Sequence, residues 1–195
     1  INNEELKKVG TITVPNTAKP FITPLNPPEF KTASGKIELF SKELKEKGFD
    51  PIPRYTRHPQ PESGEFRLIY GRHAVHTFSR TTNNPELHEL YPENEVWINA
   101  TKAHSLGIEN GTYVTLINQD GVKIPPIKVK VTERIREDCV YMVHGFRTTS
   151  KELKKSVNRG GDDQELITRY AVDPICGGTG MRVNFVRIGK ESADA

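Results

Sequence analysis

Apolar and polar residues alternate in several short stretches from Glu65 onward, and this alternation predicts β-strands. In Ile127–Thr132 the apolar residues alternate with Lys128, Lys130 and Thr132, as expected for a strand with one buried face. Patterns of this kind predict strands at residues 66–70, 95–98, 112–118, 127–132, 140–143 and 183–188.

Turn and helix signals separate these strands. Ala100–Leu106 predicts a short helix that ends at Gly107, and residues 151–157 predict another. Residues 119–121, Gln-Asp-Gly, supply the turn chemistry of a hairpin. Short strands with tight turns and few helices favour a mainly β fold, barrel-like or sandwich-like, over a doubly wound parallel sheet. We assign this domain to residues 63–195.

Residues 1–62 differ in composition from the rest of the chain, because prolines recur throughout them. Proline fixes one backbone angle and removes a hydrogen-bond donor, so we predict an extended arm. Within the arm, residues 32–35 predict a turn and residues 36–40 a short strand. Ser41 is then expected to cap a helix that ends near Gly48.

Composition narrows the class of protein. The 28 basic and 25 acidic residues are spread along the chain, and a net charge of +3 does not argue for nucleic acid binding. Cys139 and Cys176 lack the spacing of an iron–sulfur or zinc site. We expect a soluble, loop-rich domain without a membrane span or signal peptide. The start at Ile1 rather than Met leads us to expect a piece of a longer polypeptide.

The densest polar segment follows the first predicted strand, at residues 71–84. It begins with Gly71 and contains Arg72, Arg80 and a run of hydroxyl, amide and imidazole side chains. Guanidinium groups and backbone amides suit an anionic ligand such as a pyrophosphate. A solvated loop whose Thr and Asn side chains bind their own backbone is an equally weighted alternative.

Two further segments have ligand-loop character. Residues 143–146 end a predicted strand with His144 and Gly145, and glycine permits close backbone approach. Residues 173–185 place several glycines before the last strand, but they match neither the phosphate-loop signature nor the dinucleotide fingerprint. Ordinary turns are the alternative for both.

Catalytic and metal-binding patterns are weak. His73 and His76 have a spacing that a metal site uses, but no third ligand is placed near them, so their imidazoles better suit a phosphate or heterocycle. Asp162 and Asp163 lie in a polar stretch and are predicted to be solvated rather than to act as an acid–base pair. The sequence therefore predicts neither a catalytic set nor a metal site in this chain.

The order of these motifs resembles the carboxy-terminal dinucleotide-binding domain of molybdopterin oxidoreductases related to dimethyl sulfoxide reductase. A strand leads into Gly-Arg-x-x-x-His-Thr, followed by Val-Trp-Ile-Asn, a helix ending in Leu-Gly-Ile, an Asn-Gly turn and a pair of strands. Within that family, three segments are most similar to thiosulfate and polysulfide reductase catalytic subunits: residues 76–84, 141–146 and 180–185. Residues 32–39 and 48–53 resemble the segment that precedes this domain, so the resemblance covers nearly the whole chain.

The resemblance implies a six-stranded, barrel-like domain of the double-psi type with short helices. It also implies a guanine dinucleotide molybdopterin cofactor held between this domain and the rest of the enzyme. The residues expected to bind this cofactor are Gly71, Arg72, His76, Thr77, Phe78, Ser79, Arg80, Asn99, His144, Gly145, Arg182 and Asn184.

For the whole enzyme, the resemblance implies molybdenum-dependent reduction of thiosulfate or polysulfide in periplasmic anaerobic respiration. The iron–sulfur cluster and the export signal are expected in an amino-terminal part that precedes this chain. Expected partners are the remainder of the catalytic subunit, an iron–sulfur electron-transfer subunit and a membrane anchor subunit. The chain alone is expected to be inactive and to hold no cofactor.

Three other hypotheses remain open at this point. The chain is a stand-alone module for an anionic nucleotide, or a β-barrel that serves only as a packing piece, or the same domain from a formate, arsenate or tetrathionate relative. A stand-alone module predicts affinity for the guanine dinucleotide without the rest of the subunit. A packing piece predicts that replacing Arg72 and Arg80 leaves cofactor retention unchanged.

Overall fold

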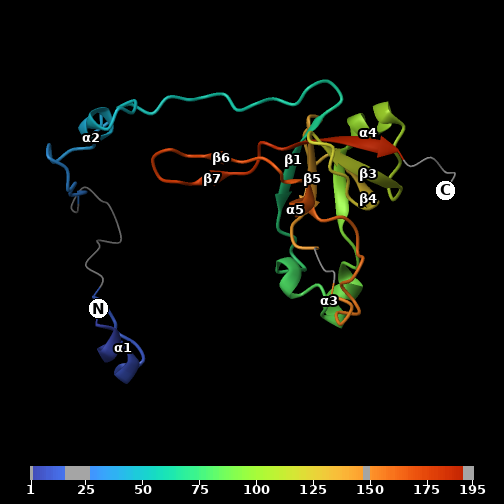
Figure 1. Ribbon diagram of the computed structural model, residues 1–195, viewed down its shortest axis with the longest axis horizontal. Coiled ribbons are helices and arrows are strands. Elements are labelled where there is room, and N and C mark those ends of the chain that lie inside the picture. The colour runs from blue at the N-terminus through green and yellow to red at the C-terminus, as the bar shows by residue number, and fades with distance from the viewer. Residues whose placement is uncertain (1, 16–26, 147–149, 191–195) are drawn as a thin grey trace. The chain divides into compact units, whose positions relative to one another are not determined.

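The computed structural model describes residues 2–15, 27–146 and 150–190 (Figure 1). The chain divides into two compact units, Ile1–Thr56 and Arg57–Ala195. All of the strands described in the structure belong to the second unit. No helix within the described ranges is long and apolar enough to cross a lipid bilayer.

Two short helices, α1 (Asn3–Val9) and α2 (Lys42–Glu46), are the helical elements described in the first unit. As predicted, Ser41 caps α2, because its hydroxyl oxygen accepts a hydrogen bond from the backbone N–H of Leu44 at 3.2 Å. The helix ends two residues before the predicted Gly48. None of the residues described in this unit is buried, so the described part contains no hydrophobic core.

The strand predicted at residues 36–40 is wrong. The turn before it is present, since the N–H of Gly35 donates to the carbonyl oxygen of Thr32 at 3.1 Å. The following residues form bends, and Ile37 and Leu39 are 68% and 79% exposed. A strand needs a neighbour for its backbone groups, and the described part of this unit offers none.

Six strands of the second unit close into a barrel, in the order β1-β5-β2-β4-β3-β8. The mainly β, barrel-like fold is therefore confirmed, and every strand predicted after residue 65 has a counterpart. The last strand starts two residues later than predicted. The strands are β1 (Phe66–Gly71), β2 (Glu95–Asn99), β3 (Tyr113–Asn118), β4 (Ile127–Thr132), β5 (Cys139–Val143) and β8 (Phe185–Lys190).

Strand direction decides which loops meet at each end of the barrel. β1 and β5 run parallel, so Gly71 lies beside Val143 where both strands end. β2 runs antiparallel to β5, so Glu95 starts β2 at this same end and Asn99 finishes it at the other. We call these the Gly71 end and the Asn99 end.

The barrel interior is filled by the inward-facing side chain of every second strand residue, as the alternation predicted. On β4, for example, Ile127 and Val129 are buried while Lys128 and Lys130 face outward. Because the interior is apolar, polar chemistry is confined to the outer surface and the two ends. The fully buried side chains of the strands include Leu68, Val96, Ile98, Leu116, Val140, Met142 and Val186.

Short helices and one small hairpin complete the unit (Figure 1). α4 forms as predicted, and Gly107 ends it in the left-handed conformation, with a φ of 60°. β6 and β7 pair with each other in a separate two-stranded sheet. The elements are η1 (Phe78–Arg80), α3 (Pro85–Leu90), α4 (Ala100–Leu106), α5 (Asp163–Leu166), β6 (Ala171–Val172) and β7 (Thr179–Gly180).

The helix predicted at residues 151–157 is wrong, because this segment forms a series of turns. The N–H of Leu153 donates to the carbonyl oxygen of Ser150 at 3.1 Å, which is the spacing of a tight turn and not of an α-helix. Leu153 itself is 39% exposed, so the segment lacks a buried apolar face that would stabilise a helix.

Candidate functional site

The predicted ligand loop begins where β1 and β5 end side by side. The carbonyl oxygen of Gly71 accepts a hydrogen bond from the backbone N–H of His144 at 2.8 Å. A Cβ added at Gly71 would lie 3.2 Å from the ring of Tyr141, so a larger residue would push against this ring. Two segments that are far apart in sequence, residues 71–84 and 143–146, therefore meet at the Gly71 end.

Gly145 lies directly against the ligand loop. Its φ is 105°, and an added Cβ would lie 2.5 Å from the backbone nitrogen of Ser79 and 2.6 Å from the carbonyl carbon of Phe78. Backbone atoms cannot yield as a flexible side chain does, so only glycine fits here. The close approach predicted at Gly145 is present, and it is an approach to the backbone of the other loop.

Arg72 is held at two points in this loop. Its guanidinium carbon lies 5.4 Å from the centroid of the Phe78 ring, a cation–π contact. Its carbonyl oxygen accepts a hydrogen bond from the Tyr141 hydroxyl at 2.7 Å. Arg72 nevertheless remains exposed. Phe78 adopts a φ of 50°, which is unusual for a residue other than glycine.

Other polar side chains of this loop also face outward. Thr77, Ser79 and Arg80 are exposed. Thr81 and Thr82 brace the backbone: the hydroxyl of Thr81 accepts from the N–H of Thr77 at 2.9 Å, and that of Thr82 donates to the carbonyl oxygen of Ser79 at 3.1 Å. The braced backbone presents hydroxyl and guanidinium donors on one loop.

His144 lies at the same end with its ring partly exposed. Its Nδ1 atom lies 2.8 Å from Oδ2 of Asp163, and its Nε2 atom lies 3.3 Å from Nε2 of Gln164. The ring also meets Phe78 edge to face, with centroids 5.2 Å apart. Its other aromatic neighbour is Tyr70, at 5.9 Å. His144 therefore links α5 to the ligand loop.

A cleft of about 280 Å³ adjoins this end and contains Arg182. Burial raises the pKa of Tyr70, which also lines the cleft, while the positive charge of Arg182 acts against that rise. The cleft is small and combines one cation with a phenol and apolar surface. Its lining residues are His58, Tyr70, Ala171, Thr179, Gly180, Met181, Arg182 and Val183.

His76 is turned into the protein. It is 4% exposed, and its Nε2 atom lies 2.8 Å from the carbonyl oxygen of Tyr91. Its Nδ1 atom lies 3.3 Å from the hydroxyl of Thr81, and its ring packs edge to face against Phe146. Both ring nitrogens thus have protein partners, which gives this imidazole a packing role behind the loop.

Asn184 is also enclosed. Its exposed fraction is 0%, and its amide oxygen accepts from the N–H groups of Thr168 and Arg169 at 3.1 and 2.9 Å. Its amide nitrogen donates to the carbonyl oxygens of Arg169 and Met181, each at 2.7 Å. This amide fastens the start of β8 to the segment before β6.

Asn99 lies at the Asn99 end of the barrel, away from the other predicted site residues. Its amide oxygen accepts from the N–H of Lys102 at 3.3 Å and so caps α4. Its amide nitrogen donates to the carbonyl oxygen of Ile135 at 2.9 Å. The structure gives Asn99 a capping function and does not bring it near Gly71.

The prediction that Asp162 and Asp163 are solvated is wrong. They are 4% and 0% exposed, because α5 packs against the barrel through Leu166, which is itself fully buried. Sequence reasoning thus missed Asp163 and Gln164 as neighbours of His144. The signal was an N-cap residue four positions before an apolar anchor, Asp162 and Leu166, which marks a short packed helix.

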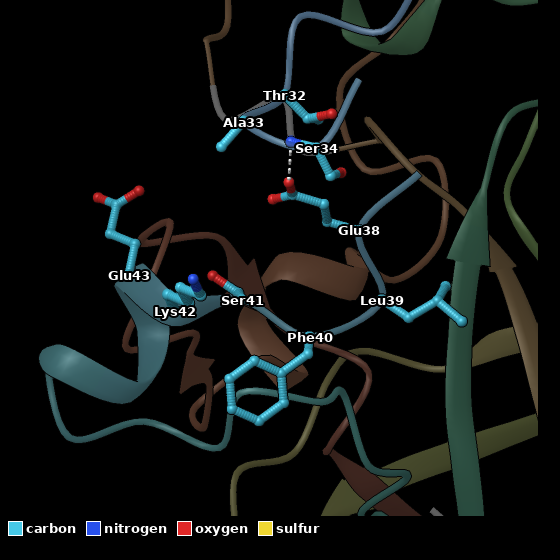
Figure 2. A pocket seen from close by; sticks show the side chains of 9 residues that line it. All are labelled: Thr32, Ala33, Ser34, Glu38, Leu39, Phe40, Ser41, Lys42 and Glu43. Carbon is cyan, nitrogen blue, oxygen red and sulfur yellow. Dashed lines mark hydrogen bonds between the residues drawn. The ribbon is translucent and has the colours of Figure 1, made fainter. Parts of the chain in front are cut away.

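The first unit has a larger, open cleft of about 830 Å³ (Figure 2). Figure 2 shows the Glu38 carboxylate turned toward Ser34, whose N–H donates to it at 2.9 Å. Glu43 also lines this cleft and forms an ion pair with Lys47. Carboxylates on an exposed, single segment suit an anionic ligand poorly, so the Gly71 end is the better candidate site.

Residues 66–185 match the family model of the Molydopterin dinucleotide binding domain. The matched region contains β1 to β5 and reaches the first residue of β8. It therefore includes the whole Gly71 end.

Curated relatives come from the same group of enzymes. The chain is 37% identical over 150 residues to the thiosulfate reductase molybdopterin-containing subunit PhsA of Salmonella typhimurium, covering 76% of this chain and 19% of that protein. It is 28% identical over 174 residues to the dimethyl sulfoxide reductase DmsA of Escherichia coli, covering 82% and 21%. The chain thus spans about a fifth of the length of these relatives.

A solved structure shares the fold. Acetylene hydratase from Pelobacter acetylenicus superposes with a TM-score of 0.62 over 86% of this chain and 25% of that protein. Sequence identity is 19%, so this likeness speaks for the fold alone.

Proposed function

Because this chain belongs to the molybdopterin dinucleotide-binding domain family, we propose that its Gly71 end binds the pyrophosphate and pterin of that cofactor. The observation that carries the proposal is the contact between the two loops, where Gly145 lies against Ser79 and the guanidinium of Arg72 lies over the Phe78 ring. Donors that are fixed before a ligand arrives lose little conformational entropy on binding.

The exposed donors at this end fit a polyanionic, hydrogen-bond-rich group. The guanidinium groups of Arg72 and Arg80 offer paired donors that match phosphate oxygens. The hydroxyls of Thr77 and Ser79 can bind the remaining oxygens. Arg182 lines the adjoining cleft and extends the positive surface. Cofactor contacts by His76, Asn99 and Asn184 stay predictions, since each of these side chains is engaged within the protein.

When bound, the molybdenum–pterin group supplies two-electron oxidation and reduction. We assign this chain the tasks of binding and orienting the group. His144, held by α5, would present its ring from one side, while Arg72 would neutralise phosphate charge from the other loop. We assign no bond-making step to any residue of this chain.

For the whole enzyme we propose reduction of thiosulfate or polysulfide. The identity of 37% with a thiosulfate reductase subunit supports this substrate class. The remainder of a catalytic subunit with an iron–sulfur cluster, an electron-transfer subunit, a membrane anchor and a periplasmic location belong to the same proposal. The purified enzyme tests this substrate assignment. If it reduces dimethyl sulfoxide but neither thiosulfate nor polysulfide, the proposed substrate is contradicted, while the proposed binding of the cofactor is not.

Replacement of Arg72 by Ala tests the binding role. In the longest natural polypeptide that carries this chain, we expect R72A to weaken cofactor retention about tenfold or more, because a charge-assisted pair of hydrogen bonds to phosphate is lost. Molybdenum by elemental analysis and pterin by fluorescence after release measure the content. Arg134 is the matched control, because it is an exposed arginine in the turn between β4 and β5, at the Asn99 end.

The outcomes separate the competing functions. Full molybdenum and pterin content in R72A and in R72A/R80A would indicate a packing role for the barrel and contradict our proposal. Tight binding of the guanine dinucleotide by the 195-residue chain alone would favour a stand-alone binding module. An equal loss in R134A would show that the effect of R72A is not specific to the Gly71 end.

A further inference from the structure

Asp163 carries a carboxylate that is completely enclosed by protein. Its side chain has no exposed surface, and Oδ2 accepts a hydrogen bond from Nδ1 of His144 at 2.8 Å. Its other oxygen, Oδ1, is buried without a hydrogen-bond partner among the residues that the structure describes. Burial of a carboxylate is costly unless its charge is used, so packing alone does not account for Asp163.

Helix capping does not account for Asp163 either. The cap of α5 is Asp162, whose Oδ1 atom accepts from the N–H of Gln164 at 3.2 Å. The carboxylate of Asp163 is therefore directed at His144 alone among the described side chains. Because Asp163 contacts the partly exposed imidazole of His144, we infer that its carboxylate acts locally, at the Gly71 end.

That local role is to fix the orientation of the His144 ring. A carboxylate accepts hydrogen bonds, so Nδ1 of His144 carries the proton that faces Asp163. The amide nitrogen of Gln164 lies 3.3 Å from Nε2 and donates to it in the neutral tautomer. Both ring nitrogens are thus held by neighbouring residues of one short helix.

The oriented ring supports the ligand loop at Phe78. The two rings meet at an interplanar angle of 84°, with the edge of one toward the face of the other. Phe78 has a φ of 50°, and such a backbone conformation persists only where its surroundings maintain it. The Phe78 ring in turn forms the cation–π contact with the guanidinium of Arg72. A continuous set of contacts therefore runs from Asp163 to Arg72.

We propose that Asp163 is a positioning residue, which acts through His144 and Phe78 to hold Arg72 toward the anionic cofactor. This inference rests on the proposed function, since it assigns a support to the same site. Asp163 itself does not contact the cofactor. Its carboxylate orders the loop that does.

The test is the rate of pterin release from the longest natural polypeptide that carries this chain, purified with its cofactor. We expect D163N to release pterin about tenfold faster, by analogy with the lower range found when a residue that orients a metal ligand is removed. Asn has nearly the same volume, so the urea unfolding midpoint should change little. Hydrogen exchange should accelerate in residues 77–82. Asp138, a carboxylate at the opposite end of β5, supplies the control variant D138N.

Double variants distinguish positioning from general stability. If Asp163 acts through Arg72, D163N/R72A should release pterin no faster than R72A alone, because the supported group is already absent. If D163N does not fold, H144Q replaces it, since His144 is partly exposed, and the same acceleration is expected. Faster release in R72A together with wild-type release in D163N would overturn the positioning role only. Wild-type release in H144Q would also contradict the proposed approach of the His144 ring to the cofactor. Wild-type release in R72A would overturn the proposed function, and additive effects would also contradict positioning.

Discussion

Gly145 shows how much a single position contributes to the candidate site. It joins the end of β5 to the ligand loop at a distance that admits no side chain, because the nearest atoms are the backbone atoms of Phe78 and Ser79. Its φ of 105° is a second constraint, since residues with a Cβ rarely adopt it. Sterics and backbone conformation therefore both require glycine here.

We predict that G145A destabilises the protein by about 2 to 4 kcal/mol, from backbone strain together with the clash against the loop. Urea unfolding measures this loss. Gly177 is the matched control, because its φ is 71° and nothing lies within 4 Å of an added Cβ. G177A carries the strain without the clash, so its cost should be only about 1 kcal/mol. Equal losses in the two variants would show that the loops do not pack as described.

The residue type alone did not predict which of the candidate site residues are exposed and which are buried. Arg72 and Arg80 were predicted as ligand contacts and are exposed, as long charged side chains usually are. His76 and Asn184 were predicted in the same way and are enclosed. An imidazole or an amide bonds equally well to protein and to ligand, so only tertiary packing decides which partner it has. The burial of Asp163 depends on the same packing.

At the scale of elements, the hairpin turn after β3 is joined to the segment before β6. Asp120 in this turn forms an ion pair with Arg169 and accepts a hydrogen bond from the hydroxyl of Thr168. The hydrogen bonds from Arg169, Thr168 and Gln119 lower the pKa of Asp120 from 3.8 to about 2. The ionised carboxylate therefore stabilises the folded state.

The pH dependence of this link has a definite sign. A carboxyl group whose pKa is lower in the folded state adds stability above its unfolded value of 3.8, and loses it as the pH falls toward about 2. We predict that D120N lowers the urea midpoint above about pH 4, and that the difference from wild type disappears near pH 2. The exposed Glu152 gives the control variant E152Q. A difference that persists unchanged at pH 2 would contradict the role of the Asp120 charge.

Elements with local signals were predicted from the sequence, and those that depend on distant partners were not. The α4 helix has Asn99 at its start and Gly107 at its end, so both boundaries are encoded nearby. Residues 36–40 alternate like a strand but lack a neighbouring strand within the described part of their unit. Residues 151–157 contain good helix formers but have no face to bury. Helix α5 was missed because a single turn gives too short a pattern.

At the scale of the whole chain, the two units differ in what stabilises them. The barrel closes through long-range pairing, as between Phe66 and Val186, and has a continuous apolar interior. The described part of the first unit has no buried residue. The sequence predicted the barrel because apolar and polar residues alternate along the strands and because the motif order resembles that of one family. It could not predict the strand order, because pairing across such distances leaves no local signal.

These differences lead to a prediction about the barrel on its own. A chain that begins at Arg57 contains every strand of the barrel, its core and the Gly71 end, so it should unfold cooperatively. We expect its thermal midpoint to lie within about 2 °C of that of the whole chain, because none of the described residues before Arg57 is buried. Calorimetry of the two proteins at equal concentration measures the difference. A large drop in midpoint, or loss of a cooperative transition, would show that residues before Arg57 contribute to the stability of the barrel.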